Sequence, residues 1–283
     1  MDWSDWDWLL DAALAEDAAE RDATTGALVD PDLEARAEVR AREPGIVCGL
    51  PLAGRLVERF GGEGVFDART GDGDPVQEGT VLAALRGPAA SILAVERTML
   101  NFLQRLSGVA TLTARFVREV EGTGARIYDT RKTTPGWREL EKYAVRCGGG
   151  RNHRMHLAGA VLIKDNHLAL LREDGARAGV EAARRAHPDL TIEVEVDTLE
   201  QLESVLPARP DIVLLDNMTP EQVRRAAQLV GERGGGSAPL LEASGGITLE
   251  NVAAYAEAGA DRIAVGALTH SAPALDISLE FSR

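Results

Sequence analysis

Three neighbouring segments decide how this chain folds. Residues 125–136 read ARIYDTRKTTPG, residues 141–154 read EKYAVRCGGGRNHR, and residues 161–167 read VLIKDNH. The apolar runs at 125–129 and 160–164 have the length of buried strands, and polar residues follow each run directly. Because α/β barrels build their sites at the carboxyl ends of their strands, these segments predict both a fold class and the place of a site.

The same alternation of short strands and helices continues along the chain. Further apolar strands are predicted at 191–196, 212–216, 240–243 and 262–265, with helices at 179–186, 199–206, 220–230 and 249–258. Repeated β-α units in this number are typical of parallel strands with helices outside, as in a barrel. The sequence GGGS at 234–237 predicts a flexible loop before a strand.

The first hundred residues follow a different pattern. Ala37, Val39 and Ala41 alternate with charged residues and predict a half-buried strand within 35–50. A second strand is predicted at 80–86, and helices are predicted at 52–61 and 91–107. These elements predict a smaller α+β module before the barrel.

Charge separates the central segments from the rest of the chain. The window from Arg126 to Lys164 contains nine Lys or Arg residues and three acids, a net charge of +6, whereas the chain of 283 residues has a net charge of −14. A basic island in so acidic a protein predicts an anion-binding site. The acidic total argues against non-specific binding to nucleic acid.

Composition narrows the class of protein further. No apolar run approaches the length of a membrane span, and the acidic, aromatic start of the chain does not resemble a secretory signal. Two cysteines, Cys48 and Cys147, give no support for a disulfide framework. We therefore expect a cytoplasmic protein without membrane or nucleic-acid partners.

Charged residues stand at the ends of several predicted strands. Lys164, Glu195 and Asp216 occupy positions where a strand end without a site would have Gly, Asn or Ser. Burying such charges is costly unless they meet opposite charges or a ligand, so convergence on one anionic substrate is the economical interpretation. Gly245 and Gly246 after Ser244, and Gly266 after Val265, follow two late strands, where barrels commonly bind phosphate.

The amino-acid sequence of the central segments resembles that of a known family. DTRKTTPG, EKYAVRCGGGRNHRMHL and AVLIKDNH are similar to the quinolinate phosphoribosyltransferases, also called nicotinate-nucleotide pyrophosphorylases (carboxylating), and the likeness extends from Glu96 to Thr269. It implies an incomplete, seven-stranded α/β barrel over 109–267. It also implies a second, smaller α/β sandwich domain over 1–108, joined by 268–283, and a homodimer or a hexamer built of dimers.

The resemblance also implies an activity in NAD biosynthesis. A pentosyltransferase of this family converts quinolinate and phosphoribosyl pyrophosphate, with magnesium, to nicotinate mononucleotide, carbon dioxide and pyrophosphate. Quinolinate carries two carboxylates, which several fixed cations would bind and desolvate.

We expect the following roles, of which those of Arg97, Glu195 and Asp216 are implied by the resemblance. The substrate-binding residues are Thr130, Arg131, Lys132, His153, Arg154, Lys164, Glu195 and Asp216, with Arg97 from a neighbouring subunit. The catalytic residues are Lys132, Lys164, Glu195 and Asp216, of which Glu195 and Asp216 also serve magnesium, directly or through water. The phosphate-binding residues are Ser244, Gly245, Gly246, Val265, Gly266 and His270.

Several other interpretations remain open from the residues alone. The chain could be a related phosphoribosyltransferase-like protein associated with molybdenum transport genes, a barrel lyase with Lys164 as a Schiff base, or a sensor of pyridine dicarboxylates. His153 and His156 could bind a metal, although Arg154 would repel it. Cys147 could be a nucleophile, but without an evident base partner we expect a small buried residue beside a tight turn.

Overall fold

The chain divides into two compact units, which are described separately. In a computed structural model that describes residues 2–61, 64–170, 175–233 and 238–281, the first unit consists of Met1–Ala114, Tyr143–Gly149 and Ala272–Arg283. The second consists of Arg115–Lys142 and Gly150–Ser271. The predicted loop at 234–237 lies outside the described residues. Across the described part of the chain, no helix is both long and apolar enough to cross a membrane.

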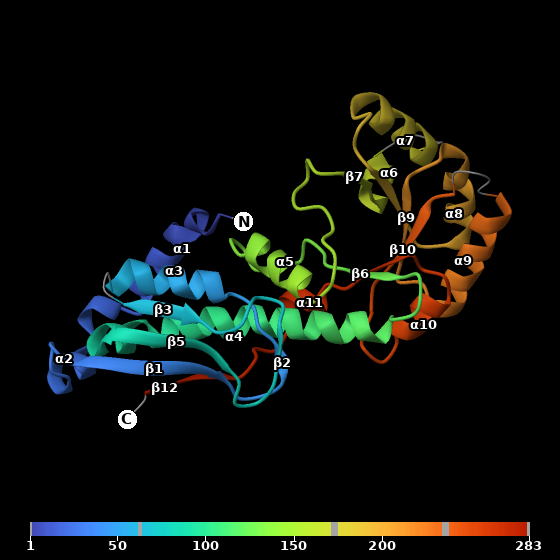
Figure 1. Ribbon diagram of the computed structural model, residues 1–283. Coiled ribbons are helices and arrows are strands. Elements are labelled where there is room, and N and C mark those ends of the chain that lie inside the picture. The colour runs from blue at the N-terminus through green and yellow to red at the C-terminus, as the bar shows by residue number, and fades with distance from the viewer. Residues whose placement is uncertain (1, 62–63, 171–174, 234–237, 282–283) are drawn as a thin grey trace. The chain divides into compact units, whose positions relative to one another are not determined.

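The first unit contains an antiparallel sheet with the strand order β12-β1-β5-β3 (Figure 1). The alternation predicted for the strand within 35–50 is confirmed, because Ala37, Val39 and Ala41 of β1 are buried. The C-terminal strand β12 completes one edge, where Val39 pairs with Leu279. The elements are α1 (Asp7–Glu16), α2 (Ala23–Leu28), β1 (Glu34–Ala41), β2 (Gly45–Ile46), α3 (Leu50–Gly61), β3 (Val65–Ala68), β4 (Pro75–Val76), β5 (Val81–Pro88) and β12 (Ile277–Phe281), with 3-10 turns at Trp3–Trp6 and Ala19–Arg21.

The helix predicted at 91–107 is much longer than expected. Helix α4 spans Ala89–Glu119 and crosses from the first unit into the second. Ser107 does not end it, because the Ser107 hydroxyl bonds the backbone N–H of Cys48 at 2.9 Å and so leaves the helix backbone intact. Buried Val109 and Phe116 continue the apolar stripe beyond that point. The Gln104 side chain donates to the Ile277 carbonyl at 2.7 Å and attaches β12 to this helix.

The second unit contains a parallel sheet with the strand order β6-β11-β10-β9-β8-β7, as counted over the described residues. All six strands predicted for this region are present. Helix α7 contacts β7 and β8, α8 contacts β8 and the following helix α9, and α10 contacts α9 and β11 (Figure 1). The bounds are β6 (Arg126–Tyr128), α5 (Arg138–Cys147), β7 (Val161–Ile163), α6 (Asp165–Leu170), α7 (Gly175–Ala186), β8 (Ile192–Val196), α8 (Leu199–Val205), β9 (Ile212–Asp216), α9 (Pro220–Arg233), β10 (Leu240–Ser244), α10 (Val252–Glu257), β11 (Arg262–Ala264) and α11 (Ala267–His270), with a 3-10 turn at Leu206–Ala208.

The edge strand β6 has one further backbone partner. Arg151 forms an isolated parallel bridge with Tyr128. Its N–H donates to the Ile127 carbonyl at 2.8 Å, and the Asp129 N–H donates to the Arg151 carbonyl at 3.1 Å. The chain therefore continues the sheet beyond β6 for one residue before it reaches β7.

Candidate functional site

The carboxyl ends of the parallel strands enclose a cavity of about 390 Å³. This volume suits a small-molecule ligand. The side chains that line it come from the second unit and are Thr130, Arg131, Lys132, His153, Arg154, Leu162, Lys164, Glu195, Leu214, Asp216, Glu242, Ser244 and Ala264. The strand register explains the convergence, because Glu195 and Glu242 both pair with Leu214, while Asp216 pairs with Ser244.

Many of the predicted site residues lie in this cavity, and some do not. The lining includes Thr130, Arg131, Lys132, His153, Arg154, Lys164, Glu195, Asp216 and Ser244 from the predicted set. Gly245, Gly246, Val265, Gly266 and His270 follow the neighbouring strand ends without lining it. Arg97 is exposed on α4 in the first unit. The structure thus supports a common location for most of the set, while the role of each residue stays a prediction.

Two arginines face the cavity without full compensation of their charge. Arg131 Nε is buried and has no hydrogen-bond partner among the described residues. Arg154 donates to the Ala160 carbonyl at 3.0 Å, and burial together with the charge of Arg131 lowers the pKa of its guanidinium. Two neighbouring half-buried cations repel each other, so an anion placed between them would be attracted strongly.

Lys164 and Glu195 form an ion pair across adjacent strands β7 and β8. The Lys164 side chain is 43% exposed, whereas Glu195 is 10% exposed. Asp216, at the end of β9, accepts a hydrogen bond from Asn217 Nδ2 at 2.7 Å. The cavity therefore has acidic groups beside its cationic ones.

His153 lies above two buried carboxylates. Its Nε2 is 3.0 Å from a Glu193 oxygen and 3.3 Å from a Glu242 oxygen. Burial alone would lower the pKa of His153, but the hydrogen bonds and charges of the two glutamates outweigh burial and raise that pKa to about 9. The Arg154 N–H donates to His153 Nδ1 at 2.8 Å, a contact that the charged imidazolium would lose. Arg262 compensates Glu242 through a second ion pair.

A buried ion pair orients the segment that carries His153. Asp129 and Lys142 are both fully buried and bonded to each other. Asp129 also accepts from the His153 N–H at 2.9 Å and from Asn152 Nδ2 at 2.6 Å. Burial raises the pKa of Asp129 and lowers that of Lys142, although their mutual attraction opposes both shifts. The pair therefore fixes the backbone from which His153 and Arg154 enter the cavity.

Backbone conformation or close neighbours explain why glycine occupies the positions after β10 and β11. Gly245 and Gly246 have φ of 94° and 61°, values that favour glycine. A Cβ on Gly245 would overlap the Asn217 side-chain oxygen. A Cβ on Gly266 would come within 3.2 Å of Lys132 Cδ and 3.1 Å of His270 Nε2, which shows how closely these residues approach.

Sequence reasoning did not single out Glu242 as a site residue and noted Glu193 only for sharing a face with Glu195. The signal was present, because a carboxylate inside an apolar strand of a parallel sheet is costly unless it is paired. A joint site for His153 and His156 finds no support: within the described residues, the possible metal-holding groups are His153, Glu193 and Glu242, and Cys48, Asp72 and Cys147. Cys147 is half-buried, so the prediction of a buried residue was wrong.

The fold and this cavity define an α/β domain with a mixed cationic and acidic cavity at the carboxyl ends of its parallel strands. The model of "Quinolinate phosphoribosyl transferase, C-terminal domain" matches residues 109–280, and the model of the corresponding N-terminal domain matches residues 22–107. The chain belongs to the quinolinate phosphoribosyl transferase family.

Individual relatives agree with this assignment. The nicotinate-nucleotide pyrophosphorylase (carboxylating) of Mycobacterium leprae is 45% identical over 263 residues, covering 92% of this chain and 90% of that protein. A probable enzyme of the same name from Bacillus subtilis is 40% identical, covering 96% and 92%. The solved nicotinate-nucleotide pyrophosphorylase of Francisella tularensis is 36% identical with a TM-score of 0.91, covering 100% of this chain and 98% of that one.

Proposed function

We propose that the chain transfers the phosphoribosyl group of phosphoribosyl pyrophosphate to quinolinate and releases pyrophosphate and carbon dioxide, with nicotinate mononucleotide as product. The observation that carries this proposal is a single cavity in which Arg131, whose buried Nε has no hydrogen-bond partner among the described residues, and Arg154 lie with the carboxylates of Glu195 and Asp216. A doubly negative aromatic acid and a sugar donor require these two kinds of group together.

The cationic part of the cavity suits quinolinate. The planar forks of Arg131 and Arg154 can bind a carboxylate through two parallel hydrogen bonds. Protonated His153 and Lys164 add further positive charge. Leu162 and Leu214 supply apolar surface for the pyridine ring in the same cavity. We assign both carboxylates of quinolinate to this group of cations.

The acidic part of the cavity suits the donor. Carboxylates accept hydrogen bonds from ribose hydroxyls, and Glu195 and Asp216 are the candidates. Their carboxylate oxygens are also the kind of ligand that magnesium binds. Neither belongs to the three-residue groups found among the described side chains, so the ion would depend on diphosphate oxygens and water for its other ligands. When bound, magnesium would neutralise charge on the departing diphosphate.

The reaction itself requires positioning more than acid–base chemistry. Attack of the ring nitrogen on the anomeric carbon breaks the bond to pyrophosphate and passes through an oxocarbenium-like state, which a nearby carboxylate stabilises electrostatically. The alkylated nitrogen then accepts the electrons left by the departing carboxylate, and carbon dioxide leaves. We assign no general base.

The rival functions make different predictions. A Schiff-base lysine needs a neutral amine, whereas the Lys164 ammonium is paired with Glu195. Borohydride with a carbonyl substrate should therefore trap no covalent adduct. Glu195→Ala or Asp216→Ala separates the enzyme from a sensor of pyridine dicarboxylates, because an enzyme should lose turnover more than quinolinate binding, whereas a sensor has no turnover to lose. A molybdenum-associated relative would turn over no quinolinate.

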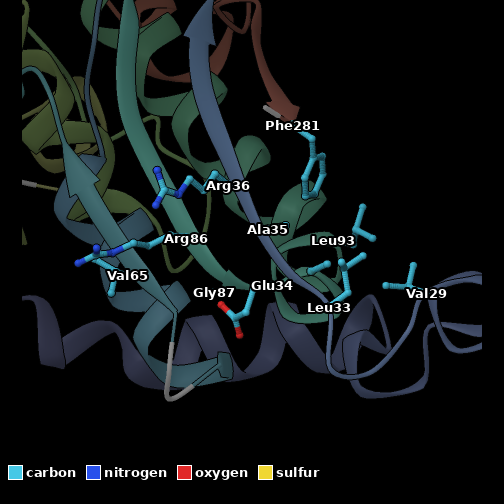
Figure 2. Close-up of a pocket in the computed structure, with 11 residues that line it drawn as sticks. Val29, Leu33, Glu34, Ala35, Arg36, Val65, Arg86, Gly87, Leu93 and Phe281 are labelled. Atoms are coloured by element: carbon cyan, nitrogen blue, oxygen red, sulfur yellow. The ribbon is translucent and has the colours of Figure 1, made fainter. Parts of the chain in front are cut away.

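A second pocket supports self-association. It has a volume of about 890 Å³ and lies against the sheet of the first unit. Figure 2 shows Leu33, Leu93 and Phe281 on one side of it and Arg36 and Arg86 on the other. Leu33 is 50% exposed and Phe281 is 40% exposed, so apolar surface remains uncovered within one chain.

We assign this face to a second copy of the chain, in a dimer or in a hexamer of dimers. Leu93 lines the pocket on α4, and Arg97 follows one helical turn later on the same face. The assignment would let Arg97 reach the partner's cavity. If Arg97 acts in trans, random mixing of Arg97→Ala and Asp216→Ala chains should restore about a quarter of wild-type turnover, whereas action in cis would restore none.

Two finer features of the family also remain proposals. We assign the Arg151 bridge beside β6 to the seventh strand of an incomplete barrel, because it lies between β6 and β7 in the chain and pairs in parallel. A cytoplasmic location stays a prediction from the cysteine content.

The direct test is to incubate the purified protein with quinolinate, phosphoribosyl pyrophosphate and magnesium and to measure pyridine mononucleotide. We expect product with release of one carbon dioxide per turnover. Absence of product from folded protein, as judged by circular dichroism, would refute the proposal.

A further inference from the structure

The two cysteines lie together in the first unit, and neither is among the residues that line the described cavity. Cys48 precedes α3, Cys147 ends α5, and Asp72 belongs to the turn between β3 and β4. The two sulfur atoms and one Asp72 oxygen are all within 4.8 Å of one another. Three segments that are distant in sequence therefore place two thiols side by side.

The two thiols differ in exposure. Cys48 is fully buried, and its backbone is fixed by the Ser107 hydroxyl, to which the Cys48 N–H donates at 2.9 Å. Cys147 is half-buried at the last residue of its helix. A small reagent from solvent can therefore reach Cys147, whereas Cys48 is not accessible to it.

The thiols also differ in acidity. Burial raises the pKa of Cys48. The hydrogen bond from Cys48 lowers the pKa of Cys147 and is a larger influence than the partial burial of Cys147, which raises it. The more accessible sulfur is thus the better nucleophile, which is the arrangement of an oxidation-sensitive thiol beside a resolving thiol.

A metal ion fits this cluster less well. Asp72 Oδ1 already accepts from the Gly49 and Leu50 N–H groups at 2.9 Å each, and Oδ2 accepts from the Tyr143 hydroxyl at 2.9 Å. With the carboxylate engaged in this way, two sulfurs remain, whereas zinc in a structural site takes four ligands.

We propose that Cys147 is a site of reversible peroxide oxidation and that Cys48 resolves the oxidised sulfur as an intramolecular disulfide. This inference does not rest on the proposed transferase function.

The chemistry balances with one peroxide. The Cys147 thiolate attacks one peroxide oxygen and breaks the O–O bond, which gives a sulfenic acid and hydroxide. The Cys48 sulfur then attacks the sulfenic sulfur, the S–O bond breaks, and the leaving hydroxide takes the Cys48 proton as water. Two thiols are oxidised to a disulfide, and one peroxide is reduced to two waters.

The test is to titrate the reduced full-length protein with hydrogen peroxide. Free thiols should fall from two per chain to none, with a mass loss of about 2 Da for the two hydrogens and full reversal by dithiothreitol. A non-reducing peptide map should join the peptides that contain Cys48 and Cys147. The chain should stay at its own mass on a non-reducing gel.

Matched variants assign the two roles. In Cys48→Ser, dimedone should trap Cys147 as a sulfenic acid that proceeds to sulfinic acid. In Cys147→Ser, Cys48 should stay reduced, because it is buried. The proposal is overturned if wild-type Cys147 proceeds to sulfinic acid while Cys48 stays reduced, if disulfides form only between chains, or if the purified protein retains zinc that protects both thiols.

Discussion

Replacing Arg131 by Ala should weaken quinolinate binding while leaving the fold intact. Arg131 Nε is buried, and no described residue bonds it, so the side chain has a desolvation cost that no described partner of this atom offsets. Removing it should therefore leave the unfolding midpoint unchanged or slightly higher. This combination separates a ligand-binding arginine from a structural one, whose loss would lower that midpoint.

The magnitude follows from the interaction that is lost. A hydrogen bond to a charged group contributes about 1.5–3 kcal/mol, and a loss of about 2 kcal/mol corresponds to a roughly 30-fold higher Kd. Arg131→Lys keeps the charge but not the planar fork, so it should fall between Ala and wild type.

Isothermal titration with quinolinate measures the Kd, and a thermal melt measures stability. Arg177→Ala is the matched control, because Arg177 has the same charge in the same unit but is 65% exposed in a pair with Glu181. If Arg131→Ala bound quinolinate as tightly as Arg177→Ala does, or unfolded at a clearly lower temperature than wild type, the reasoning about the cavity would be wrong.

Three further predictions concern other parts of the second unit. The pKa of His153 is raised from 6.5 to about 9, so the stabilisation from its positive charge is fully present below pH 6.5 and is lost as pH rises through about 9. An NMR titration of His153 should find a midpoint of about 9. A midpoint at or below 6.5 would contradict this prediction. Gly245→Ala should raise the KM for phosphoribosyl pyrophosphate in steady-state kinetics, because Cβ would overlap Asn217; an unchanged KM would argue against phosphate binding there. Lys142→Met should lower the free energy of unfolding by roughly 3–5 kcal/mol in urea, because it leaves Asp129 charged and buried; a loss under about 1 kcal/mol would show that the pair is dispensable.

The strands of the second unit and most residues of the cavity could be predicted from the sequence, and the reason is physical. Short apolar runs that end in Lys, Glu or Asp have few structural explanations, and Lys164, Glu195 and Asp216 do line one cavity. The six strand positions follow from the same runs, because a strand buried on both faces must be apolar along its length.

Features that depend on distant segments had no local signal. Helix α5 reads as one amphipathic element, yet Lys142 belongs to the second unit and Tyr143 to the first. Nothing near Cys48 indicates that Cys147 lies beside it. The end of α4 was missed because Ser107 resembles a helix boundary in sequence, whereas its hydroxyl bonds a segment far away in the chain.

The pairing of β12 with β1 has a consequence for synthesis on the ribosome. Strand β1 is among the first parts of the chain to emerge from the exit tunnel, but its partner at the sheet edge lies at Ile277–Phe281. The N-terminal unit lacks its edge strand until those residues are translated, whereas every described strand of the parallel sheet precedes them in the chain. The order of folding during translation is thus expected to be the reverse of the usual N-terminal-first order.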